Sequence, residues 1–381
     1  MKQIILGGLL ACSSFAAAQN YKIIDLGPLV PVGINIEGEV AGNLNGNAAV
    51  WTSAGGTKTL GRLPGGTFSH AAAINDIGVV AGTADGPGLL FDTNSGFVSC
   101  EDLTQPFTWS QSQGFVTAQS IPIVFDLGPL CDQVDYTNGI NLFSQVVGSN
   151  IDFATYKYGY VWNKSGLSLF KGFFQTNANA INDFGMVAGQ ISNFLPLYEQ
   201  SHASFWNNGK ATDLGTLAAK GSNWSACSGA TGVNDLDQVV GWSGTAVSTG
   251  SFPCDDLIDM STPVHAFIWQ SGTGMRDLGT LPGDRSSEAQ KISLTGVVIG
   301  SSGDEVIQDP ENEYSLQVVG HPFIWSQGTG MRDLNTLLPH KSSWTLNSVA
   351  DINVWGQIVG TGTFKGETHG FLLTPAVIFR F

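Results

Sequence analysis

One ten-residue phrase recurs seven times along the chain, and this repetition constrains the fold more than any other feature. Each copy consists of two short apolar runs separated by a turn, and the copies occupy residues 33–42, 73–82, 139–148, 180–189, 232–241, 291–300 and 351–360. From Asn35 in the first copy to Asn353 in the last is 318 residues over six intervals, or 53 residues per unit. Repeats of about 20–50 residues are typical of solenoids and propellers.

Each unit predicts four strands, which we name a, b, c and d. In the copy at 180–189 (AINDFGMVAG), β-forming residues flank a tetrad in which asparagine bonds to its own backbone and glycine supplies a positive φ. Ser144 and Asp237 replace this turn glycine in two units, so we expect those turns to be looser or differently built. A glycine that ends strand b is present every time, which indicates a crowded backbone position; these are Gly42, Gly82, Gly148, Gly189, Gly241, Gly300 and Gly360.

Strands c and d come from two further phrases. Strand c alternates, as in His265-Ala-Phe-Ile-Trp269, so phenylalanine and tryptophan share one sheet face while alanine and isoleucine share the other. Strand d carries Asp-Leu-Gly, as at 277–279. Four strands per unit predict an all-β fold, a seven-bladed β-propeller of four-stranded antiparallel blades. Residues 83–138 have room for extra strands.

The ends of the chain predict how the ring closes. A strand d at 21–29 has no strand c before it, and a strand c at 370–373 has no strand d after it. These two strands can pair, which removes exposed sheet edges. We therefore expect one propeller domain over residues 19–373 and a short tail over residues 374–381.

The first residues have the character of a secretory signal. Lys2 precedes an apolar run at 4–11, and small residues continue to Ala18, after which we expect cleavage. The run is shorter than the roughly 20 residues that span a bilayer, and no other stretch qualifies. We expect a secreted or periplasmic monomer, with lipoprotein processing at Cys12 as the alternative. With 16 basic and 31 acidic residues the net charge is −15, which disfavours nucleic-acid binding.

Four cysteines remain after the signal, and an oxidising compartment favours disulfides. We predict the pairs Cys227–Cys254 and Cys100–Cys131, while other pairings remain open. The spacing does not match the short Cys-x₂₋₄-Cys pattern of zinc sites.

The phrases HAFIW (265–269), DLGTLPG (277–283) and VNDLDQVVG (233–241) resemble the HAF family of extracellular repeat proteins. The resemblance covers nearly all of the chain after the signal. It implies a bacterial secreted repeat protein, and the family carries no established catalytic residues. The first three units lack the histidine before strand c, so their register is less secure.

In a propeller the a–b and c–d turns lie on one face of the disc and the b–c and d–a connections on the other. The longest connections, at 83–105, 242–264 and 301–320, are of the b–c type, so we place function on that long-loop face. Candidate binding residues there are Trp224, Trp242, Trp344, Asp255, Asp256 and Asp259. Candidate calcium ligands are Asp309, Glu311 and Glu313. Structural packing of the tryptophans and a solvated acidic loop are the alternatives.

The sequence favours binding over catalysis. His202, His265, His321 and His369 recur at one position per blade, which indicates capping or packing, and the chain has no G-x-S-x-G, H-E-x-x-H or phosphate-binding glycine loop. The leading hypothesis is a non-catalytic scaffold for an extracellular polymer, protein or surface ligand. The alternatives are a polysaccharide-acting hydrolase or lyase with carboxylates near the propeller axis, and a structural envelope component. No cofactor is expected, apart from calcium.

Overall fold

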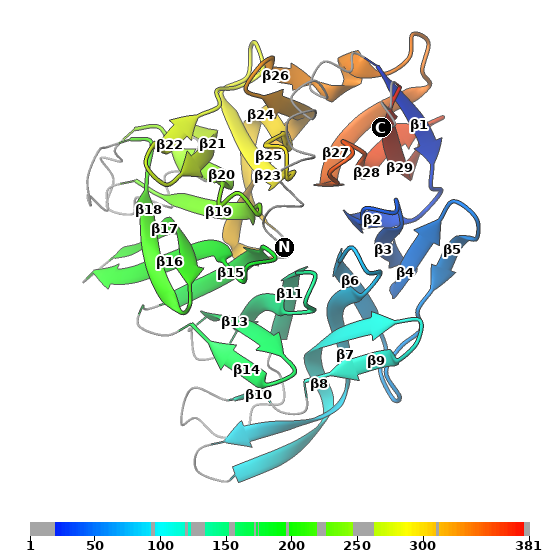
Figure 1. Ribbon diagram of the computed structural model, residues 1–381, viewed down its shortest axis with the longest axis vertical. Coiled ribbons are helices and arrows are strands. Elements are labelled where there is room, and N and C mark those ends of the chain that lie inside the picture. Colours follow the sequence, from blue (N-terminus) through cyan, green and yellow to red (C-terminus); the bar gives the residue numbers. More distant parts are fainter. Residues whose placement is uncertain are drawn as a thin grey trace, which may run out of the picture.

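The structure, a computed structural model, describes residues 20–92, 96–118, 121–122, 134–151, 157–170, 173, 175–195, 198–218, 226–246, 263–309 and 312–376. It is a seven-bladed propeller whose blades are four-stranded antiparallel sheets around a central axis (Figure 1). We number the blades in chain order. Blade 2 carries one additional strand, β10 (Ile121–Pro122), which pairs in parallel with β7.

Strands a lie nearest the axis and are followed outward by strands b, c and d. Strands a are β2 (Val30–Ile34), β6 (Ser69–Ile74), β11 (Val134–Ile140), β15 (Gln175–Ile181), β19 (Ser228–Val233), β23 (Ser286–Ile292) and β27 (Trp344–Ile352). Strands b are β3 (Val40–Leu44), β7 (Val80–Asp92), β12 (Val146–Ile151), β16 (Val187–Leu195), β20 (Val239–Gly244), β24 (Val298–Asp309) and β28 (Ile358–Phe364).

Strands c are β4 (Asn47–Thr52), β8 (Gly96–Ser110), β13 (Lys157–Asn163), β17 (Tyr198–Asn207), β21 (Val264–Gln270), β25 (Asn312–Ser326) and β29 (Glu367–Pro375). Strands d are β5 (Gly56–Thr59), β9 (Gly114–Thr117), β14 (Gly166–Leu169), β18 (Lys210–Gly215), β22 (Gly274–Asp277), β26 (Gly330–Asp333) and β1 (Tyr21–Asp25). A short 3-10 helix, η2 (Leu334–Leu337), follows β26. In the part of the chain described, no helix is long and apolar enough to cross a membrane.

The predicted ring closure is confirmed. Strand β1 pairs antiparallel with β29, with Tyr21 opposite Pro375 and Asp25 opposite Phe371, so blade 7 combines the two ends of the chain. The strand β29 reaches Pro375, two residues into the segment that was expected to be the tail.

The alternation predicted for strand c decides how the blades pack. In β21, Phe267 and Trp269 pack with residues of blade 4, whereas Ala266 and Ile268 pack with residues of blade 6. The equivalent aromatic rings of strand c are also fully buried, which stabilises each interface between blades; they include Phe107, Tyr160, Phe323 and Phe371.

Two expectations about connections are wrong. Residues 83–105 and 301–320 are not loops, because most of them extend β7, β8, β24 and β25 into long hairpins. The turns with Ser144 and Asp237 are not looser either. Both residues adopt positive φ, 57° and 60°, and keep the hydrogen bonds of the glycine-containing turns. The asparagine of the turn therefore dictates the geometry strongly enough to hold a non-glycine residue in the left-handed region.

The glycine that ends strand b is required by close packing, as the sequence indicates. A Cβ at Gly189 would overlap the carbonyl oxygen of Asn177 on the neighbouring strand a, and the same clash recurs in the other blades.

Candidate functional site

The structure places two of the predicted binding tryptophans in packing roles. Trp242 is 3% exposed and packs with Cys227 and Val264. Trp344 is half-buried and stacks on Phe364, with ring centroids 4.8 Å apart. Both rings are engaged by their own chain, as the packing alternative expects.

The structure does not describe the side chains of the other predicted binding and calcium-ligating residues. Trp224, Asp255, Asp256, Asp259 and Glu311 lie outside the described residues. Asp309 and Glu313 lie in β24 and β25, on either side of a hairpin end, and their side chains are not described. Calcium binding therefore stays a prediction.

The cysteine pairings also stay predictions. Cys227 is fully buried and disulfide-bonded. The side chains of Cys100, Cys131 and Cys254 are not described, so the structure does not identify its partner.

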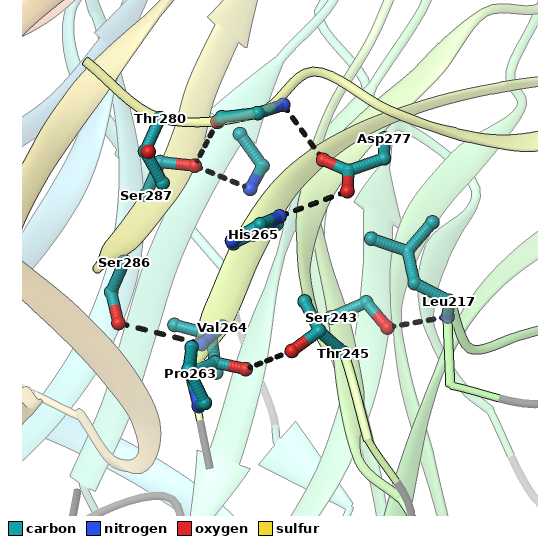
Figure 2. Close-up of polar contacts among 12 residues, drawn as sticks. Leu217, Ser243, Thr245, Pro263, Val264, His265, Asp277, Thr280, Ser286 and Ser287 are labelled. Carbon is teal, nitrogen blue, oxygen red and sulfur yellow. Dashed lines mark hydrogen bonds and ion pairs between the residues drawn. The ribbon is translucent and has the colours of Figure 1, made fainter. Parts of the chain in front are cut away.

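The recurring histidines have a structural role, linking strand c to the aspartate of strand d. His265 Nδ1 lies 2.9 Å from Asp277 Oδ2, as Figure 2 shows, and His202 pairs with Asp213 at 3.0 Å. His369 pairs with Asp25 at 2.8 Å and so joins the two ends of the chain. His321 lies 3.9 Å from Asp284, a carboxylate outside strand d. The histidine bond and a backbone N–H hold the pKa of Asp277 below its usual value, despite the opposing effect of burial.

Beside the His265 and His202 pairs, a serine hydroxyl connects neighbouring blades, a feature that sequence reasoning missed. Ser287 of β23 donates to the carbonyl of Gly279 at 2.6 Å and accepts from the N–H of Ala266 at 2.8 Å (Figure 2). Ser228 makes the equivalent bonds between blades 4 and 5. Both serine hydroxyls therefore donate and accept hydrogen bonds within the propeller itself.

The turns between strands a and b form a ring of asparagines around the axis. In each such turn the asparagine Oδ1 accepts two backbone N–H groups, as Asn182 does from Phe184 and Met186. In five blades the Nδ2 atom donates at 3.0 Å to the carbonyl of the equivalent residue in the next blade, and these bonds run from Asn75 to Asn141, Asn141 to Asn182, Asn182 to Asn234, Asn234 to Ser293 and Asn353 to Asn35. Blade 6 has Ser293 in place of the asparagine, and the Nδ2 of Asn35 donates to Glu39 Oε2 at 2.8 Å.

Three carboxylates lie on this ring, each directly after a ring asparagine. Asp76 Oδ1 accepts from the N–H of Ile36 at 3.0 Å, Asp183 Oδ1 from Leu142 at 2.8 Å, and Asp235 Oδ1 from Asp183 at 2.9 Å. Burial raises the pKa of Asp76, and the charge of Asp183 adds to the effect. Burial likewise raises the pKa of Asp235, with further repulsion from Asp183, Asp76 and Asp237.

The turns between strands a and b also carry exposed apolar side chains. The third residue of the turn is Ile77, Phe143, Phe184, Leu236 or Trp355 in five blades, with exposures of 64%, 69%, 63%, 42% and 44%. These are five of the nine strongly exposed large apolar side chains in the described part of the chain. We call these five residues the apolar crown. Four of them come from the consecutive blades 2–5, while Glu37 and Thr295 interrupt the crown in blades 1 and 6.

One further polar pair interrupts the repeat on strands a. At the position occupied by Gly33, Ala73, Gly139, Ala180 and Gly232 in other blades, β23 has Lys291 and β27 has Asp351. Asp351 accepts from the N–H groups of Ile34 and Ile352, both at 2.9 Å. Burial raises the pKa of Asp351, although Lys291 and the two N–H groups oppose the shift.

Comparisons with known proteins support the fold and assign no role. No protein-family model matches the chain, and no similar curated protein is found. The HAF-type resemblance therefore stays a prediction.

Solved structures do match, at low identity. A virginiamycin B lyase from Staphylococcus aureus has a TM-score of 0.50 at 9% identity, with 93% of this chain and 99% of that chain covered. The β-propeller domain of the Trilobed protease from Pyrococcus furiosus has a TM-score of 0.48 at 10% identity, with 92% and 96% covered. An extracellular domain of a putative one-component system from B. thetaiotaomicron has a TM-score of 0.44 at 11% identity, with 94% and 40% covered. The likeness to the virginiamycin B lyase supports the fold alone, and none of the three assigns a role to this chain.

Proposed function

We propose that this protein is a non-catalytic binding propeller, secreted or periplasmic, that docks a peptide segment of a protein partner on the face formed by its a–b turns. The observation that carries the proposal is the apolar crown, whose side chains are between 42% and 69% exposed around one axis. Contiguous apolar groups on a soluble surface mark interaction sites. This places binding on the face opposite to the long-loop face that the sequence favours.

The chemistry of the crown favours a protein over other partners. Ile77 and Leu236 are aliphatic and cannot donate hydrogen bonds to sugar hydroxyls. A net charge of −15, with carboxylates on the same turns as three of the crown residues, opposes adsorption to anionic lipid. A second copy packed face to face would bring the same carboxylates together. An apolar peptide with basic residues meets both the apolar and the charged parts of this face.

The test uses the purified protein and an array of random decapeptides. We expect peptides rich in leucine, phenylalanine and arginine to bind, and the pair Phe143→Ser/Phe184→Ser to weaken their binding by about tenfold or more. The matched control is Val116→Ser/Val319→Ser, which replaces two apolar side chains that are 43% and 42% exposed outside the crown.

Three results would overturn the proposal. They are the absence of any peptide binding, an equal loss of binding in the control pair, and a dimer in solution that dissociates in the crown pair. Thermal unfolding curves of both pairs establish that each remains folded.

A second candidate function is the polysaccharide-acting hydrolase or lyase, and the Lys291 and Asp351 pair favours it. A carboxyl whose pKa is raised suits general acid catalysis. Incubating the protein with a panel of polysaccharides tests this function. Product release that disappears in Asp351→Asn supports it, and no release from any substrate rejects it.

A further inference from the structure

We propose that Gln190 and Trp242 form a binding site for a saccharide hydroxyl group between blades 4 and 5, on the side of the blades away from the apolar crown. The two side chains present a pair of N–H donors, Gln190 Nε2 and Trp242 Nε1, for which the described part of the chain supplies no acceptor. This site is separate from the docking face, and it does not depend on the proposed function.

The position directly after the glycine that ends strand b joins neighbouring blades. Asn43 makes two bonds of this kind, because its Oδ1 accepts from the N–H of Ala71 at 2.7 Å and its Nδ2 donates to the Ala71 carbonyl at 3.1 Å. In blades 1, 2 and 3 the side chain at this position bonds to strand a of the following blade, and the bonds join Asn43 to Ala71, Thr83 to Thr137 and Ser149 to Asn177.

The pattern breaks between blades 4 and 5. Gln190 occupies this position in blade 4, and the residue of blade 5 that corresponds to the acceptor Asn177 is Gly229, which has no side chain. Blade 5 alone has a glycine there, whereas the equivalent residues of the other blades are Val30, His70, Tyr136, Asn177, Glu288 and Ser348.

Gln190 is left with a buried donor that has no acceptor. The residue is 4% exposed, and its Nε2 atom is buried without a hydrogen-bond partner. Its Oε1 atom accepts from Asn177 Nδ2 at 3.5 Å, so the amide nitrogen faces Gly229 of blade 5. Because a buried donor without an acceptor is destabilising, its presence indicates that the acceptor comes from outside the chain.

Trp242 adds a second donor at the same point. A Cβ built on Gly229 would lie 2.6 Å from Gln190 Nε2 and 2.8 Å from Trp242 Nε1, so both nitrogens lie beside one backbone position. The indole ring packs against Cys227 and Val264, but its Nε1 makes no hydrogen bond with the described part of the chain. One oxygen atom can therefore accept from both nitrogens.

The surroundings favour a neutral oxygen over an ion. Two N–H donors oppose a cation. Glu288 is 5% exposed and accepts from the N–H of Val318, which packs with Trp242, so an acidic side chain nearby opposes an anion. A hydroxyl group is neutral, accepts from N–H groups and can donate its own hydrogen onward. Saccharides and water both offer this chemistry, and the experiment distinguishes them.

The experiment follows the indole N–H signals of the ¹⁵N-labelled protein by NMR, and Trp242→Phe identifies the signal of Trp242. Methyl glycosides of glucose, galactose, mannose and N-acetylglucosamine are added separately, and sodium acetate and ammonium chloride serve as ionic probes. We expect a glycoside to shift the Trp242 signal until it saturates, and neither ionic probe to do so.

Two variants test the donors directly. Gln190→Met keeps the size of the side chain and removes its donor, so it should weaken glycoside binding by about fivefold to tenfold. Gly229→Ser places a hydroxyl beside both nitrogens and should abolish the response. The matched control is Gln105→Met, which removes a buried amide of blade 2 whose Nε2 already donates to the Pro87 carbonyl at 3.3 Å, and it should leave the titration unchanged.

The possible results separate the interpretations. If no glycoside shifts the Trp242 signal, the oxygen is an internal water molecule and the proposal is wrong. A shift with acetate or ammonium in place of the glycosides rejects the ligand class. Binding that is unchanged in both Gln190→Met and Gly229→Ser, or weakened equally by Gln105→Met, rejects the site. Thermal unfolding curves show which variants are folded, and either of the two site variants is sufficient for the comparison. None of these results depends on peptide binding, so the docking face stands or fails separately.

Discussion

Replacing Asn182 with alanine tests the asparagine ring that supports the proposed docking face. The side chain is 4% exposed and makes three hydrogen bonds. Its Oδ1 accepts from Phe184 at 3.1 Å and Met186 at 2.9 Å, and its Nδ2 donates to the Asn234 carbonyl at 3.0 Å. Asn182→Ala leaves the buried Met186 N–H unpaired, at a cost of about 1–3 kcal/mol. The Asn234 carbonyl loses the bond between blades but still accepts from the Asp237 N–H at 3.1 Å, so this loss costs about 0.5–1.5 kcal/mol.

The Phe184 N–H lies on an exposed residue and can bond to water instead, so its loss adds less. The total is a decrease of about 2–4 kcal/mol in the free energy of unfolding. Asn182→Asp separates the two functions of the side chain, because it keeps the acceptor within the turn and replaces the donor between blades. We expect a smaller loss of about 1–3 kcal/mol for this variant.

Urea unfolding, followed by tryptophan fluorescence, measures all three proteins. The exposed Asn347, whose Nδ2 bonds to Thr363 at 3.1 Å, provides the matched control, and Asn347→Ala should change stability by about 0.5 kcal/mol or less. If Asn182→Ala costs no more than Asn347→Ala, the ring does not hold the blades and the reasoning is refuted.

Three further predictions concern the scaffold. The Asp25 carboxylate raises the pKa of His369, so this pair stabilises the fold fully below the unfolded pKa of about 6.5 and progressively less as the pH rises through the folded pKa. In urea unfolding, His369→Gln should therefore cost more stability at pH 6 than at pH 9. An equal cost at both pH values would contradict this linkage. Ser144→Gly should stabilise by about 0.5–1 kcal/mol, since φ is 57° there, and a loss in the melting temperature would show that the side chain is needed. Gly189→Ala should destabilise by about 1–3 kcal/mol through its clash with the Asn177 carbonyl, and unchanged chemical denaturation would show that the strands can separate at no cost.

The fold could be predicted from the sequence because the same local signals recur along the chain. The glycine that ends strand b is present in all seven units, and the Asn-x-x-Gly turn is complete in four of them. Each signal has a physical meaning in a single unit, and its recurrence strengthens the prediction. The pairing of β1 with β29 could be predicted for the same reason, because the strand d at the start of the chain and the strand c at its end each lack a partner.

The proposed docking face could not be predicted in the same way. Sequence reasoning placed function on variable connections, yet 83–105 and 301–320 largely continue the strands. The signal that was overlooked lies within the repeat. The third turn residue varies between blades, and Phe143 and Phe184 occupy it where a polar residue is usual in a turn. Only the ring geometry shows that these side chains gather around one axis.

The most direct test of the docking face is site-specific photo-crosslinking. Benzoylphenylalanine is introduced in place of Phe184 in one protein and in place of Val319, outside the crown, in another. Each protein is illuminated with a labelled decapeptide selected from the peptide array, and mass spectrometry measures the crosslinked fraction. The account predicts crosslinking from position 184 that excess unlabelled peptide abolishes, and none from position 319. Crosslinking from position 319 alone, or from neither position, would contradict it.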